Sequence, residues 1–64
     1  MSTFKNQLME QINFYKSESV KLGRQAQEKE DAGDLMTACL LRQYSEGYVR
    51  GVSRLQNKLD SLSN

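Results

Sequence analysis

The feature that most constrains this chain is a pair of largely apolar stripes, each with alternating spacings of four and three residues. The first stripe comprises Leu8, Ile12, Tyr15, Ser19, Leu22 and Ala26, and Phe4 extends it upstream. The second comprises Ala38, Leu41, Ser45, Tyr48, Val52, Leu55, Leu59 and Leu62. This spacing keeps residues on one side of an α-helix, as in a coiled coil, whereas a strand needs alternation every second residue. The sequence therefore predicts two amphipathic helices, over about residues 3–31 and 35–62.

The stretch between the stripes, residues 31–34, carries signals that end one helix and begin the next. Gly33 readily adopts the left-handed conformation that closes a helix, and Asp34 is a preferred N-terminal cap. Because a link this short makes the helices antiparallel neighbours, the predicted fold of residues 1–64 is an all-α two-helix hairpin. One uninterrupted helix through Gly33 is the alternative. Gly23 is a second candidate break, since a glycine inside a helix costs about 1 kcal/mol relative to alanine.

The two stripes also match each other when the chain folds back at Gly33. Small residues meet near the turn, and large ones meet toward the chain ends. The pairs brought level include Ala26 with Ala38, Ser19 with Ser45, and Tyr15 with Tyr48. This agreement between two independent stripes supports the hairpin.

A hairpin of 64 residues has little room for a core, so it needs a further source of stability. One cysteine and no histidine exclude an intrachain disulfide and leave too few ligands for a structural zinc site. Small scaffolds without such staples commonly rely on oligomerisation or on a larger partner. We therefore expect the hairpin to self-associate as a homodimer or higher oligomer, forming a four-helix bundle or a larger helical assembly.

The segment 35–41 is apolar on every side of its predicted helix. The stretch opposite it, residues 25–31, is nearly all polar and cannot cover it. Because a helix that is apolar all round is normally buried, this segment predicts an interface with a second copy. A different protein partner, or partial exposure, are the alternatives.

Gly47 and Gly51 lie on one side of the second helix together with Leu40 and Tyr44. Glycines inside a helix are unfavourable, so close approach of another helix is the favoured explanation. Tolerated poor propensity and room for a ligand are the alternatives. Phe14 stands opposite the first stripe as a candidate partner contact. The predicted oligomer or partner interface comprises Leu35, Met36, Cys39, Leu40, Tyr44, Gly47, Gly51 and Phe14.

The basic residues Arg50, Arg54 and Lys58 recur every four residues and form a stripe beside the glycines. Four basic residues against one acidic residue give the segment 42–58 a net charge of +3, although the whole chain carries only +1. A basic helical face can follow phosphates, so contact with an RNA or DNA backbone is one hypothesis. A solvated face or a set of intersubunit ion pairs is the alternative. A third hypothesis is a small anionic ligand held between subunits by these arginines and nearby tyrosines, Tyr44 and Tyr48.

The residues that carry catalysis are missing from the sequence. Cys39 lies in an apolar run without a neighbouring base, and a nucleophile needs one. The glycines at 47 and 51 lie inside a helix, not in a phosphate-binding turn, and the carboxylates near the turn lack calcium-loop spacing. The chain is therefore predicted to be no enzyme and to bind neither a metal nor a cofactor.

The leading functional hypothesis is a small adaptor or inhibitor that acts by protein–protein interaction, of the kind that phages and plasmids encode. Its apolar runs are too short to span a bilayer, and its first residues lack the apolar core of a signal peptide. With a single cysteine, these features favour the cytoplasm and no membrane contact. The size and hairpin plan resemble those of small plasmid RNA-binding proteins that dimerise into four-helix bundles. No motif is shared, so the resemblance concerns architecture alone.

Overall fold

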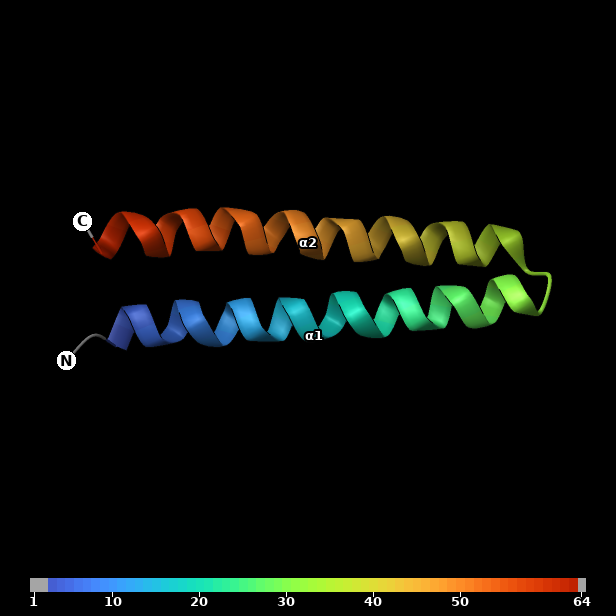
Figure 1. Cartoon of the computed structure of the whole chain (residues 1–64), viewed down its shortest axis with the longest axis horizontal. Helices are drawn as coiled ribbons and strands as arrows, with labels where there is room; N and C mark the ends of the chain where they lie inside the picture. Colours follow the sequence, from blue (N-terminus) through green and yellow to red (C-terminus); the bar gives the residue numbers. More distant parts are fainter. Residues whose placement is uncertain (1–2, 64) are drawn as a thin grey trace.

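The computed structural model describes residues 3–63 and consists of two helices, α1 (Thr3–Asp31) and α2 (Leu35–Ser63). The helices run antiparallel, side by side along their whole length, with the turn at one end and the start of α1 and the end of α2 at the other (Figure 1). The predicted two-helix hairpin is confirmed, and the alternative of one uninterrupted helix is wrong because the chain reverses at Gly33.

Gly33 closes α1 and reverses the chain with a positive φ of 85°. Its N–H donates to the carbonyl of Glu30 at 2.9 Å, and the N–H of Asp34 donates to the carbonyl of Lys29 at 2.8 Å. These two bonds form the Schellman pattern, which satisfies carbonyls that the end of a helix leaves free. The left-handed conformation explains why the chain has glycine here.

Asp34 directly follows Gly33 and is the N-terminal cap of α2. Its Oδ1 accepts from the backbone N–H of Thr37 at 3.1 Å, and its carbonyl accepts from the N–H of Ala38 at 3.1 Å. Hydrogen bonds from the Thr37 side chain and backbone lower the pKa of Asp34, with a smaller contribution from the charge of Lys29. The same residue thus completes the cap of α1 and caps α2.

The core is a single seam between the two helices. Only four apolar residues in the described part of the chain are buried: Leu8, Ile12, Ala26 and Ala38. Most of the remaining stripe residues are half-buried. Leu62 and Phe4 depart from the predicted stripes, with half of each side chain exposed, because they lie at the open end of the hairpin.

The register of the seam follows the predicted pairs. The hydroxyl of Ser45 donates to the carbonyl of Ser19 at 2.8 Å. The rings of Tyr15 and Tyr48 meet edge to face, with centroids 5.3 Å apart and planes at 77°. Edge-to-face contact suits the quadrupoles of the two rings and adds to the burial of their carbon atoms. The predicted level pairing at both places is confirmed.

The hairpin is a rod whose extents are 49 × 15 × 10 Å, with a radius of gyration of 14.7 Å. A compact domain of this length would have a radius of gyration of about 11 Å. Its accessible surface is 4941 Å², whereas a compact protein of 7.3 kDa exposes about 4,200 Å². The chain therefore exposes surface that a closed fold of the same mass would bury.

Candidate protein-interaction surface

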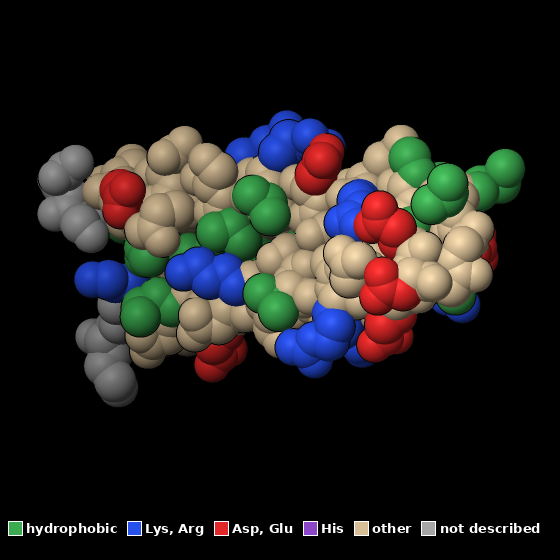
Figure 2. Space-filling model, turned by 45° about the vertical axis from the view of Figure 1, so that its right-hand side comes forward, with side chains coloured by type: hydrophobic (Ala, Val, Ile, Leu, Met, Phe, Trp, Pro, Cys, Tyr) green, Lys and Arg blue, Asp and Glu red, His purple; other side chains and the backbone are tan. Residues whose placement is uncertain are grey.

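The start of α2 leaves its apolar side chains uncovered, as the sequence predicts. The exposed fraction is 65% for Leu35, 79% for Met36 and 47% for Leu40, and Cys39 is exposed as well. Figure 2 shows hydrophobic side chains protruding at the end of the molecule that carries the turn. Ala38 is the buried residue of this segment, because it faces the seam. The hairpin alone therefore leaves Leu35, Met36, Cys39 and Leu40 of the segment 35–41 exposed.

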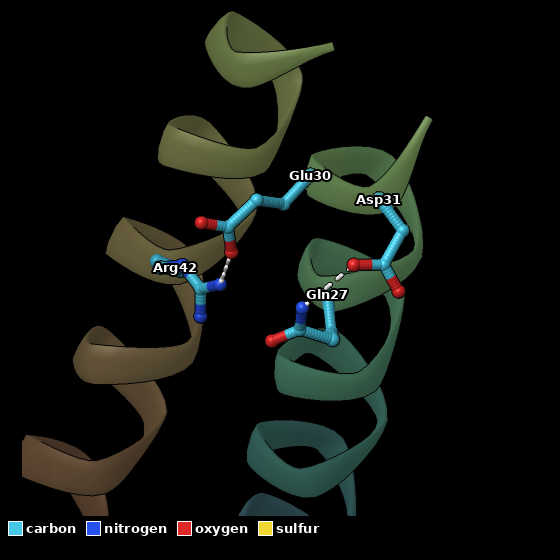
Figure 3. A network of polar contacts seen from close by, with 4 residues as sticks. All are labelled: Gln27, Glu30, Asp31 and Arg42. Atoms are coloured by element: carbon cyan, nitrogen blue, oxygen red, sulfur yellow. Dashed lines mark hydrogen bonds and ion pairs between the residues drawn. The ribbon is translucent and has the colours of Figure 1, made fainter. Parts of the chain in front are cut away.

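The carboxylates beside this apolar end are held by local contacts (Figure 3). Arg42 reaches across from α2 to form an ion pair with Glu30, and the Gln27 amide donates to Asp31 at 3.0 Å. Within residues 3–63, no group of three or more histidine, cysteine or acidic side chains is placed to hold a metal ion. Near the turn, Asp34 therefore caps α2, and Glu30 and Asp31 pair with neighbouring side chains.

Midway along the rod, the two helices form an open groove beside Gly47. A β-carbon at position 47 would meet no atom within 4 Å, and the neighbouring Tyr44 is 61% exposed. The groove has a volume of about 440 Å³, and its lining residues are Glu18, Leu22, Gln43, Tyr44, Gly47 and Tyr48. Because Gly47 has no side chain, the surface of α2 is recessed and open at this position. The other lining residues lie close to its level in the hairpin register, which is the signal by which the sequence could have revealed them.

Gly51 does not face open surface, although the sequence predicts that it does. A β-carbon at position 51 would lie 2.7 Å from Cδ2 and Cε2 of Tyr15, so this glycine makes room for a ring of α1. The interpretation of Gly47 and Gly51 as one outward-facing pair is therefore wrong for Gly51. The ring of Tyr15 fills the space at Gly51, whereas the space at Gly47 is open.

The basic stripe of Arg50, Arg54 and Lys58 is exposed along α2 toward the open end. The ion pair between Arg42 and Glu30 is the one that forms within residues 3–63, and it does not involve the stripe. The groove beside Gly47 contains a carboxylate and no basic side chain. A single hairpin therefore does not bring these cations to the tyrosines that the anionic-ligand hypothesis requires.

Phe14 lies on α1, 56% exposed, with its ring 6.2 Å from that of Tyr15. The side chains around it, Gln7, Glu10 and Gln11, are mostly polar. An exposed aromatic in polar surroundings offers a smaller contact than the start of α2. Val20 and Val49 are comparably exposed.

No protein-family model, curated protein or solved structure matches this chain. Neither helix, over the residues that the structure describes, combines the length and apolarity needed to cross a membrane.

Proposed function

We propose that this chain is a non-enzymatic protein-binding module, an adaptor or inhibitor that docks an α-helix on the exposed side of α2. The observation that carries the proposal is a row of three apolar residues spaced by four, Met36, Leu40 and Tyr44, which we call the α2 ridge. Their exposed fractions are 79%, 47% and 61%. Residues four apart on a helix form the ridges that fit into the grooves of a second helix.

The surroundings of the ridge support binding rather than catalysis. The amide of Gln43 donates to Cys39, with 3.9 Å between Nε2 and Sγ, and an amide is no base for a thiol. The carboxylates at the turn serve in caps and side-chain pairs. What the surface offers a partner is exposed apolar area, which commonly marks interaction sites.

Site-specific photo-crosslinking in cells that produce the full chain tests this proposal. A photoreactive amino acid at position 40 or 44 is expected to give covalent adducts with a protein, because both positions lie on the ridge. The same amino acid at Ser53, exposed on another side of α2, is the matched control. Equal adducts at all three positions, or none at 40 and 44, would overturn the proposal.

A second candidate function is contact with a nucleic-acid backbone, favoured by the exposed row of Arg50, Arg54 and Lys58. It predicts gel shifts with RNA or DNA that weaken steeply with salt, since phosphate contacts release counterions. A triple alanine variant of the stripe should abolish the shifts. A charge-matched control removes Lys16, Lys21 and Arg24, which are exposed on α1. Absence of any shift at low salt would rule this candidate out.

A further inference from the structure

We infer that the docked helix is α2 of a second copy of this chain, packed antiparallel so that Tyr44 of each copy covers Gly47 of the other. The inference rests on the proposed docking of a helix at the α2 ridge and names the partner. Five features of the hairpin support it: symmetry, shape, charge, surface area and the polarity of α1.

The spacing of the α2 ridge suits a two-fold axis. In an antiparallel pair of identical helices, every pair of facing residues has the same midpoint in the sequence, because the two contacts are equivalent. Tyr44 and Gly47 are centred between positions 45 and 46, and so are Leu40 and Gly51. One axis at that point therefore places two of the three ridge residues, Leu40 and Tyr44, over glycines at once. Each side chain would lie where the opposing helix has no β-carbon.

The surface at Gly47 suits Tyr44 of the other copy, and the surface at Gly51 suits Leu40 of the other copy. Gly47 is open, and the adjoining groove of about 440 Å³ has room for the ring of Tyr44. At Gly51 the space is filled by the ring of Tyr15. Leu40 of the other copy would therefore meet aromatic carbon, which suits an apolar side chain.

Charge favours the antiparallel direction over the parallel one. Residues 28–34 carry four carboxylates and one lysine, a net charge of −3, and residues 50–58 carry three basic residues and no acidic one. With the axis between positions 45 and 46, Lys58 of one copy comes level with Gly33 of the other, between Asp31 and Asp34. A parallel pair would instead align like charges, which disfavours it.

The area that the hairpin exposes fits one partner of its own size. Its 4941 Å² exceed the surface of a compact protein of this mass by roughly 700–800 Å². A standard interface removes about 800 Å² from each partner. A dimer through the α2 ridge would therefore bring the surface of the assembly close to that of an ordinary folded protein.

The α1 side of the same face is too polar to join the contact fully. Glu18 lines the groove, and Gln7, Glu10 and Gln11 lie around Phe14 and Tyr15 along α1. Burying these groups without partners would be unfavourable. The geometry therefore points to contact between the two α2 helices, with the α1 helices outside, in place of a bundle in which all four helices share one core.

Spin-label distances test the direction and register. Cys39 and Asn57 are both exposed and lie eighteen residues, or five full turns, apart, so they share one side of α2. Wild-type protein is labelled at Cys39, and a second sample carries Cys39→Ser with Asn57→Cys. At 1.5 Å per residue, labels in the antiparallel dimer are offset along the axis by about 20 Å at position 39 and about 35 Å at position 57. A parallel dimer gives equal distances at both positions and overturns the inference.

A monomer at every concentration in light scattering would also overturn the inference, but not the proposed function. The two failures are distinguishable, because photo-crosslinks from the ridge to a different protein would persist in that case. Loss of those crosslinks as well would overturn both.

Substitution of the glycine tests the close approach itself. Gly47→Leu adds apolar surface and a good helix former. If the copies associated only through non-specific apolar contact, this variant would therefore associate more tightly. If Tyr44 of the other copy lies over Gly47, the same change weakens the dimer at least tenfold. Gly23→Leu on α1 is the matched control, since a β-carbon there also meets nothing within 4 Å. Tighter association of Gly47→Leu would overturn the inference, and circular dichroism of both variants verifies that the helices are intact.

Discussion

Tyr15 of α1 lies against Gly51 of α2 so closely that a β-carbon on Gly51 would stand 2.7 Å from two ring carbons. The ring is also in edge-to-face contact with Tyr48 of α2, which limits how far it can move. Gly51 is therefore fixed by packing inside the hairpin, although its position on an exposed helix suggests a surface role.

Gly51→Ala is expected to destabilise the hairpin although alanine is the better helix former. The added methyl must displace Tyr15 from a packed site, and such overpacking costs about 1–3 kcal/mol. Gly23→Ala, where a β-carbon meets open space, should instead raise stability by up to about 1 kcal/mol. Urea unfolding of both variants checks the opposite signs. A gain for both would contradict the contact with Tyr15.

Gly33→Ala is expected to destabilise the hairpin by about 1–2 kcal/mol. Position 33 has a φ of 85°, and a β-carbon there collides with the following carbonyl even though no other part of the chain is near. Equilibrium unfolding in urea measures the loss. Gly33→Asn is the informative companion, since asparagine tolerates this conformation better than alanine. Equal losses for the two variants would mean that the positive φ is not the cause.

Ser45→Ala is expected to cost about 0.5–1.5 kcal/mol. The Ser45 hydroxyl donates to the carbonyl of Ser19 across the seam at 2.8 Å, and its loss leaves that partly buried carbonyl without this donor. Ser17→Ala removes a hydroxyl from an exposed position of α1 and serves as the control. Identical unfolding midpoints for the two variants would show that the bond across the helices adds nothing.

Asp34 is expected to make the stability of the hairpin fall in acid. Its pKa in the folded chain is lowered by the hydrogen bonds of Thr37, so folding favours the ionised carboxylate. The stabilisation is therefore complete above the pKa of the unfolded chain and is lost as the pH falls through the lower folded value. The difference in melting temperature between the wild type and Asp34→Ala should shrink below about pH 4. A constant difference from neutral pH to pH 2.5 would contradict this role.

The hairpin could be predicted from sequence because periodicity and the turn signals at Gly33 and Asp34 all act locally. The register of the two helices could also be predicted, since the two stripes permit few ways of pairing. Ser19 and Ser45 come level in the favoured pairing. These features depend on spacing along one helix, which a sequence displays directly. Partners for individual side chains across the seam were harder to infer.

The contact of Gly51 with Tyr15 could not be predicted from the sequence. Whether a residue beside the seam faces α1 or solvent depends on the rotation of α2 by a fraction of a turn, which the stripe does not fix. The pair of Arg42 with Glu30 likewise depends on two long side chains, each with many rotamers. The exposure of Leu35, Met36 and Leu40 could be predicted because the facing segment of α1 is polar. The contacts of one chain do not show which molecule, if any, packs on them.

The seam and the α2 ridge should respond differently when a large apolar side chain is truncated. Ile12 is 3% exposed and Leu40 is 47% exposed. Ile12→Ala is expected to cost about 2–5 kcal/mol at every protein concentration, because it leaves a cavity between α1 and α2.

Leu40→Ala should barely change the stability of the monomer, because much of the side chain is already in water. It should instead reduce the rise of melting temperature with protein concentration, since association stabilises the folded state by mass action. Thermal unfolding of the wild type and both variants over a hundredfold range of concentration separates the two effects. If Leu40→Ala lowered stability equally at all concentrations, Leu40 would belong to the core of the hairpin, and the ridge would not be a docking surface.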